Sequence, residues 1–377
     1  MNLQHSDSFF DALTGTLRAI FTDRSILMVM VVSVVIYSFF YPTAYQQQVA
    51  SERPILVVDH DLSSSSRALI RNIHNTRAVK VIGQPRSEME AEAMIAAVAA
   101  EGYVVIPDGF EKNILRGDQG QIALYASGAW LGRTNTIMTG LGEAITAFAQ
   151  DAAVDQASFA GAATQPPFQL VQRPLFNTRE GYASALITGV AELIVQQTLL
   201  MGIAMLAATR REQKGQLFLS GTQLWGVSSA LMLMGFINLL YYAGFAFWIH
   251  DYPRGENLAG LLLGSALFVG AVIALGLFIA SFFQTRERAY QLILVITLPC
   301  FFLSNLSWPA TATPEWLVWL AKLIPSTAGI NLMIKFNQQG ASFAEASQEI
   351  MNLVVLIVVF GCLAWWRYRK PSTASQA

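Results

Sequence analysis

The sequence predicts a membrane protein with an all-α transmembrane domain of six helices, an α/β extracytoplasmic domain and an N-terminal amphipathic helix. Hydrophobic residues make up 54% of the 377 residues and charged residues only 13%, about half the share in soluble proteins. The segment 44–180 is the exception, because it holds 25 of the 49 charged residues. The net charge of −1 provides no basic field that would attract nucleic acid.

An amphipathic interfacial helix is expected first, within residues 1–24. Apolar residues recur at helical spacing from Phe9 to Phe21, while Asp11 and Arg18 fall on the opposite side. Such a helix suits the plane of the cytoplasmic leaflet, with its apolar side in the acyl boundary. The alternative is a helix packed against another protein surface, and both arrangements can hold together.

Six apolar runs are long enough, or nearly so, to cross a membrane as helices, which takes about 20 residues. The first transmembrane helix is expected at 25–43 and five more within 181–366. About 25 residues with three aspartates precede the first run, so it resembles an uncleaved anchor more than a signal peptide. The runs themselves are 26–41, 183–208, 224–248, 258–283, 289–306 and 350–366.

Basic residues beside these runs predict the orientation of the chain. If the N-terminus is cytoplasmic, the short inner connections carry ten Lys or Arg and the outer ones three, counted over the sequence. Both termini, including the tail 367–377, are therefore placed in the cytoplasm. The segment 44–180 is placed outside the inner membrane.

The segment 44–180 reads as strands alternating with helices, which implies an α/β layer. Short apolar runs bounded by turn residues predict four strands, and stretches with helical spacing predict three helices. The expected strands are 54–58, 79–82, 103–106 and 121–126, and the expected helices are 62–74, 88–100 and 131–159.

Motifs for catalysis or metal binding are absent from the sequence. It has no GxxxxGK[ST] phosphate loop, so this chain is not expected to hydrolyse ATP. It has no HExxH or CxxC, and its four histidines are scattered. The run Asp59-His60-Asp61 could suggest a metal or a general base, but a strand end with helix-capping aspartates is favoured. Cys300 and Cys362 both fall in apolar runs and are interpreted as packing residues.

Several motifs, in order along nearly the whole chain, resemble the permease subunit of type-2 ABC exporters. The resemblance is to the branch with a large extracytoplasmic domain between the first two spans. Lys214 lengthens the usual loop motif, and Asn305 stands where the family often has glycine. The motifs are VDHD at 58–61, IPDGF at 106–110, TRREQKGQL at 209–217, GLFIASFFQT at 276–285, LSN at 303–305, WP at 308–309, PEWL at 314–317 and LIPST at 323–327.

The resemblance implies one half of a dimeric pore, served by a cytoplasmic ATPase dimer. The second half would be another copy or a homologous permease, and a periplasmic membrane-fusion adaptor is a further candidate partner, as is membrane lipid. This chain would bind no cofactor, because ATP and Mg belong to the ATPase.

The resemblance also assigns two candidate sites. The loop 209–223 would couple to the ATPase, and the segment 307–349 would form re-entrant helices that roof the pore. The residues expected to couple are Arg210, Arg211, Glu212, Gln213, Lys214 and Gly215. The residues expected in the re-entrant gate are Trp308, Pro309, Pro314, Trp316 and Pro325.

Glu192 is the one ionisable residue inside an apolar run. A carboxylate near mid-bilayer costs about 2.5–3.5 kcal/mol on insertion scales, so it should face the bundle or a cavity. One interpretation is a polar patch of Glu192, Gln196 and Asn238 that lines the translocation path or a dimer seam. The other is a protonated Glu192 hydrogen-bonded to Gln196 or Asn238.

Two classes of function remain. The favoured one is the permease of an ATP-driven exporter that moves a hydrophobic or amphipathic cargo, such as a drug-like molecule or lipid, out of the cell. The alternative is a non-transporting membrane receptor or scaffold whose outer domain binds a ligand. A receptor would account for the outer domain but not for the further spans or the coupling-like loop.

Overall fold

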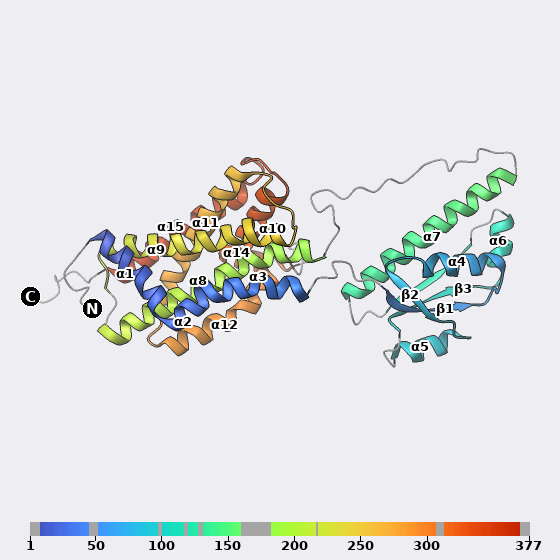
Figure 1. Ribbon diagram of the computed structural model, residues 1–377, viewed down its shortest axis with the longest axis horizontal. Helices are drawn as coiled ribbons and strands as arrows, with labels where there is room; N and C mark the ends of the chain where they lie inside the picture. The colour runs from blue at the N-terminus through green and yellow to red at the C-terminus, as the bar shows by residue number, and fades with distance from the viewer. Residues whose placement is uncertain are drawn as a thin grey trace, which may run out of the picture. The chain divides into compact units, whose positions relative to one another are not determined.

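The computed structural model describes residues 8–44, 52–96, 100–116, 120–126, 131–159, 182–215, 218–306 and 313–369. The chain divides into two compact units, one of residues 47–173 and one that combines 1–46 with 174–377. We call the first the α/β unit and the second the helical unit. Figure 1 shows the elements of each.

The α/β unit is built on a four-stranded sheet in the order β2-β1-β3-β4. The first three strands are parallel, with Asp59 opposite Ile106 at the end of the register, and β4 is antiparallel to β3. All four predicted strands are confirmed. The strands are β1 (Arg53–Asp59), β2 (Val79–Gly83), β3 (Gly102–Ile106) and β4 (Ala123–Ala126).

Helices cover both faces of this sheet, because alternate residues of a strand point to opposite sides. Ile55 and Val57 belong to the core shared with α4 and α7, whereas Leu56 and Val58 belong to the core shared with α5. The three predicted helices are present, and a short fourth one, α6, was not predicted. The helices are α4 (Ser64–His74), α5 (Glu88–Ala96), α6 (Phe110–Arg116) and α7 (Leu131–Phe159).

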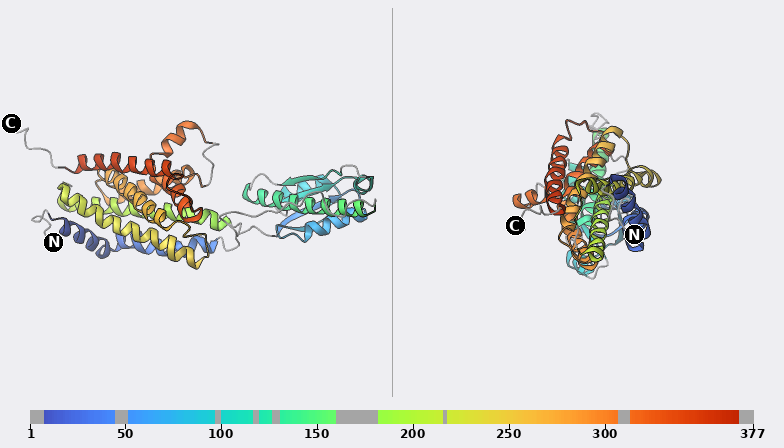
Figure 2. Two further views of the ribbon diagram at one scale, coloured as in Figure 1. Left: turned by 90° about the horizontal axis from the view of Figure 1, so that it is seen from above. Right: turned by 90° about the vertical axis from the view of Figure 1, so that its left-hand side faces the viewer.

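The helical unit is a bundle around α8, whose apolar stretch is wholly buried by the other helices. A helix that is apolar all round belongs in such a central position. Figure 2 shows the long helices running side by side. The α-helices are α1 (Phe9–Thr22), α2 (Arg24–Leu27), α3 (Ser33–Ala44), α8 (Tyr182–Lys214), α9 (Gly221–Leu240), α10 (Phe247–Ile249), α11 (Leu258–Ala280), α12 (Arg286–Leu303), α13 (Glu315–Ala321), α14 (Pro325–Met333) and α15 (Ser347–Tyr368). Wider π-helical turns at Met28–Val32, Tyr241–Ala246 and Ile334–Gln338 join some of them.

Within the described residues, five helices are long and apolar enough to cross a membrane. They cover five of the six predicted runs. The remaining run, 289–306, corresponds to α12, which has 18 residues and carries three charges in its first turn. A bent pair, α13 with α14, would raise the number of candidates to six if it formed one span. The multi-span character is therefore confirmed, while the count of six stays a prediction.

The expected N-terminal helix is present as α1 and packs on α9. Its contact is close at Gly226, where a Cβ atom would lie 2.5 Å from the carbonyl oxygen of Phe9. Ile20 is buried, while Phe10 and Phe21 are exposed. Protein packing therefore accounts for one side of α1, and membrane contact by its exposed phenylalanines stays a prediction.

Candidate coupling cluster and membrane groove

The predicted coupling residues from Arg210 to Lys214 continue α8, so the expected coupling loop 209–223 begins as a helix. Helical structure extends to Lys214, and Gly215 follows with φ of 73°. Its amide donates to the carbonyl of Arg211 at 2.8 Å. A glycine in the left-handed region is a common end for a helix. The charged segment is thus rigidly continuous with the central helix of the bundle.

Arg210 and Arg211 point into the bundle. Arg210 donates to the Thr16 hydroxyl of α1 at 3.1 Å. Arg211 donates to the carbonyl of Ser281 at 3.0 Å and to that of Phe283, both in the turn between α11 and α12. These two arginines therefore join α8 to its neighbours. Their predicted contact with an ATPase stays a prediction, as does that of Gln213, which is exposed.

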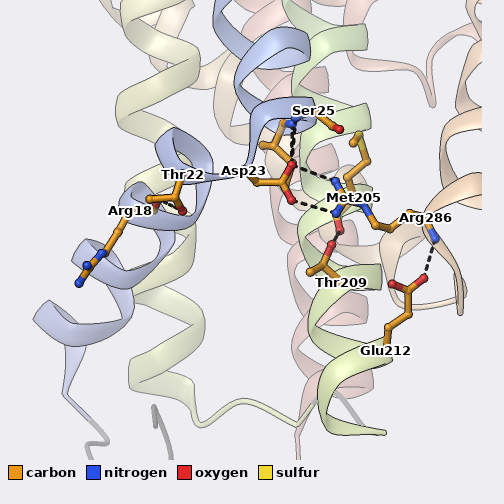
Figure 3. Close-up of polar contacts among 9 residues, drawn as sticks. Arg18, Thr22, Asp23, Ser25, Met205, Thr209, Glu212 and Arg286 are labelled. Carbon is orange, nitrogen blue, oxygen red and sulfur yellow. Dashed lines mark hydrogen bonds and ion pairs between the residues drawn. The ribbon is translucent and has the colours of Figure 1, made fainter. Parts of the chain in front are cut away.

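Glu212 takes part in a cluster with Asp23 and Arg286, shown in Figure 3. Arg286 donates two hydrogen bonds to the Asp23 carboxylate, at 2.9 and 3.1 Å. Glu212 accepts from the backbone amide of Arg286 at 3.1 Å. We call these three residues the coupling cluster. It brings together the start of α2, the end of α8 and the start of α12.

The Asp23–Arg286 ion pair has features of a strong pair. It is bidentate, and its side chains are only 27% and 25% exposed, so water screens it less than a surface pair. The hydrogen bond from Arg286 is the main cause that lowers the pKa of Asp23 below its ordinary value. Asp23 also accepts from the amides of Ser25 and Ile26 and so caps α2. No local sequence signal indicates this pair, because its partners are 263 positions apart.

The predicted gate is described only in part. Trp308 and Pro309 lie outside the described residues. Pro314 precedes α13, Trp316 is exposed on it, and Pro325 begins α14. The two helices are bent by 81° relative to each other. The prediction that this bent pair enters and leaves on one side of the membrane is untested.

The hydrogen bonds predicted for Glu192 are wrong. Gln196 donates to the Ser326 hydroxyl at 3.1 Å, and Asn238 donates to the Met30 carbonyl at 2.8 Å. Glu192 is buried, and among the described residues its Oε2 has no partner. Sequence spacing placed these side chains near one another, but different neighbouring helices hold Gln196 and Asn238.

A groove of about 710 Å³ lies on another side of α8. It is bounded by the π-helical turn Met28–Val32 and α3, by α8 and by α12, and none of Glu192, Gln196 or Asn238 lines it. Most of its lining is apolar or aromatic, and its polar groups include Gln197 and Thr198. Gln197 was missed as a site residue. The helical periodicity of the sequence could have identified Gln197, because positions 190, 193, 194, 197 and 201 lie on one face of a helix. Residues that show the character of the lining are Ile36, Tyr37, Leu193, Gln197, Tyr290 and Leu298.

In the α/β unit, the two aspartates of the run 59–61 accept hydrogen bonds from backbone amides. Asp59 accepts from the amides of Asp61 and Leu62 and from the Ser66 hydroxyl. Asp61 accepts from the amide of Glu111 and so caps α6, whereas Ser63 caps α4. Among the described residues, no group of His, Cys, Asp or Glu is arranged to hold a metal ion. The predicted strand end at Asp59 is confirmed, whereas of the two aspartates only Asp61 acts as a helix cap, and it does so at α6.

Comparison with known proteins gives matches over nearly the whole chain. The family described as ABC-2 family transporter protein matches residues 24–366. The inner membrane transport permease YhhJ of Escherichia coli (strain K12) is 21% identical over 385 aligned positions, covering 98% of both chains. A Shigella flexneri permease of the same name matches equally. ABC transporter G family member 20 of Dictyostelium discoideum is 30% identical over 128 residues, which is 33% of this chain and 17% of that protein.

Proposed function

We propose that this chain, which belongs to the ABC-2 family of transporter proteins, is the permease subunit of an ATP-driven exporter in an inner membrane. Family membership implies association with an ABC ATPase. In this proposal ATP and Mg bind to that partner, an ATPase dimer. The present chain provides the path through the membrane and carries out no chemistry of its own.

The observation that carries the proposal is that the coupling cluster lies on the helical segments that continue into the walls of the groove. Asp23 precedes α2, Glu212 lies at the end of α8 and Arg286 begins α12. The groove is bounded by α8 and α12, and by the turn Met28–Val32 and α3, which continue the chain directly from α2. A displacement of the exposed end of α8 would therefore be passed through hydrogen bonds to the other walls of the groove. This is the connection that a transporter needs between ATP hydrolysis and its pore.

The lining of the groove suits a hydrophobic or amphipathic cargo. Its volume of about 710 Å³ is typical of pockets for small molecules. Apolar and aromatic side chains would hold the body of such a cargo, and the Gln197 amide would bind a polar group on it. Outward transport is part of the proposal because the motifs of the chain resemble those of type-2 ABC exporters.

A second permease, identical or homologous, would close the groove. Tyr37, Leu294 and Leu298 line it and are exposed, as are the neighbouring apolar residues of α12. Large exposed apolar surfaces mark contacts with protein or lipid. In the same arrangement the α/β unit lies outside the membrane, where a membrane-fusion adaptor could reach it.

Purification of the full chain with its ATPase tests the proposal. Glu212→Lys should leave insertion unchanged, because surface substitutions usually alter stability by about 0.5 kcal/mol or less. It would place a positive charge beside Arg286, and we expect ATP-dependent accumulation of an amphipathic dye in inverted vesicles to fall at least about tenfold, the effect of about 1.4 kcal/mol. Glu287→Lys is the matched control, since this exposed residue lies on the first turn of α12 outside the coupling cluster.

Two results would contradict the proposal. One is a purified chain that never recovers an ATPase. The other is equal dye accumulation by the wild type and by Glu212→Lys, with both retaining the ATPase. That second result would mean that the charged end of α8 serves only to anchor the helix at the membrane surface.

A further inference from the structure

A second cleft, of about 680 Å³, lies in the helical unit and shares no lining residue with the groove. It is bounded by the end of α12, by α13 and α14, and by the start of α15. Neither the coupling cluster nor the cargo path of the proposed function uses it. We call it the α13–α15 cleft.

Part of the lining of this cleft is polar, and one of its hydrogen-bond acceptors has no donor among the described residues. The Asn352 amide donates to the carbonyl of Lys322 at 3.1 Å. Its oxygen Oδ1 is buried and has no partner among the described residues. A buried acceptor of this kind usually has a donor, so its partner should come from a ligand or water.

The charges of the lining leave one cation without a counter-ion. Glu349 lines the cleft, but both of its oxygens already accept from Lys335, at 2.8 Å each. Lys322 lies with its ammonium 3.8 Å from the centre of the Trp319 ring. Within the described part of the chain it has no carboxylate within 4 Å. The cleft therefore presents one unneutralised positive charge.

Another part of the lining is apolar and continues along α15. Phe302, Met351 and Val355 line it. Met351 and Val355 are also exposed, and Val358 and Val359 extend the exposed apolar surface down the helix. Because α15 qualifies as a membrane-crossing helix, this surface is suited to acyl chains.

We propose that the α13–α15 cleft binds one anionic phospholipid, with the chemistry of phosphatidylglycerol. The phosphate would accept from the Lys322 ammonium, and a glycerol hydroxyl would donate to Asn352 Oδ1. The acyl chains would lie along the exposed side of α15. Phosphatidylcholine offers no O–H or N–H donor for Asn352 and carries no net charge, so it should bind less well. In the proposed topology this site faces the outer leaflet.

Native mass spectrometry of the full detergent-purified chain, with any ATPase that accompanies it, provides the test. Phosphatidylglycerol and phosphatidylcholine are titrated separately. We expect phosphatidylglycerol to be retained preferentially, and Lys322→Gln to weaken that retention about fivefold, the loss of roughly 1 kcal/mol per basic residue near a lipid surface. Lys322→Arg keeps the charge and should retain the lipid. Asn352→Leu should also reduce the preference for phosphatidylglycerol.

Arg369→Gln is the matched control, because Arg369 also lies over a tryptophan, Trp365, but at the opposite end of α15. Its lipid retention should equal that of the wild type. Equal binding of the two lipids by the wild type overturns the proposal, even if a variant fails to fold. Equal losses from Lys322→Gln and Arg369→Gln also overturn it, since they would indicate general attraction to anionic lipid instead of a site.

Discussion

The α/β unit and the helical unit place their large apolar side chains differently. In the α/β unit, Val57 and Leu56 are buried on opposite faces of one sheet, and helices cover both. In the helical unit, Val295, Met351 and Trp366 are 73%, 67% and 61% exposed. The first arrangement removes apolar surface from water within the unit itself. The second leaves a surface that lipid or another protein must cover.

Polar side chains show the same difference. Asp59 ends a strand of the α/β unit and finds three donors within seven residues of itself. In α8 of the helical unit, Glu192, Gln196 and Gln197 are buried, and each has at least one side-chain atom without a partner among the described residues. Polar groups are rarely left so in an apolar environment unless they serve a function. The buried polar groups of α8 are therefore candidates for function, whereas the hydrogen bonds of Asp59 serve its own turn.

The largest expected effect is a difference in solubility between the two units when each is expressed without the other. Residues 47–173 expressed alone should be soluble and unfold cooperatively in urea, because their two cores lie within the unit. A chain that joins 1–46 to 174–377 should require detergent. Circular dichroism and size-exclusion chromatography measure both. An aggregated or non-cooperative 47–173 fragment would show that the comparison does not hold.

Cysteine labelling in intact cells tests on which side of the membrane the α/β unit and the charged end of α8 lie. Cys300 and Cys362 are first replaced. A cysteine at His74, which is exposed on α4, should then react with an impermeant maleimide, whereas one at Gln213, exposed at the end of α8, should react only after the cells are opened. Reaction of Gln213→Cys in intact cells would reverse the proposed orientation.

Substitution of two neighbouring glutamines of α8 tests which buried polar side chains take part in cargo transport. Gln197 lines the groove, whereas Gln196 bonds to Ser326 and does not line it. Gln197→Leu should raise the dye concentration needed for half-maximal transport about fivefold to tenfold, as loss of one hydrogen bond of about 1 kcal/mol allows. Gln196→Leu should leave that concentration unchanged and alter thermal stability instead. The opposite pattern would place the cargo on the other face of α8.

The smallest effect concerns the local polar bonds of the α/β unit. Burial alone would raise the pKa of Asp61, but hydrogen bonds from Ser63 and the amide of Glu111 lower it overall. Asp61 therefore adds stability above its unfolded pKa of about 3.9, and this is lost as the pH falls through the lower folded value. In the 47–173 fragment, Asp61→Asn should reduce the free energy of unfolding at pH 7 by about 0.3–1 kcal/mol, because Asn keeps an acceptor oxygen but loses the negative charge beside the helix N-terminus.

The difference between Asp61→Asn and wild type should shrink below about pH 3, where both carry a neutral side chain. Urea titrations at several pH values measure it. Asp108→Asn is the control, because Asp108 is exposed beside the same helix. A constant difference at every pH would mean that the charge of Asp61 plays no part.

The sequence alone determined which segments enter the membrane unit and which form the sheet. A buried strand shows as a short apolar run bounded by turn residues, and a spanning helix shows as a long apolar run, so each is encoded within a few to about 25 residues. The four strands and the helices α4, α5 and α7 follow from such patterns. The helix α6 did not, because its 7 residues are too few to display a helical period.

The contacts between these elements, in contrast, became known only from the tertiary structure. Helical phase put Glu192 and Gln196 on one face of α8, but it could not show that Ser326 of α14 would take the hydrogen bond of Gln196. Nor could any local pattern pair Asp23 with Arg286 across 263 positions. Such contacts depend on how whole helices pack against one another. A single sequence carries no periodicity that specifies that packing, so the coupling cluster and the groove became visible only in the folded chain.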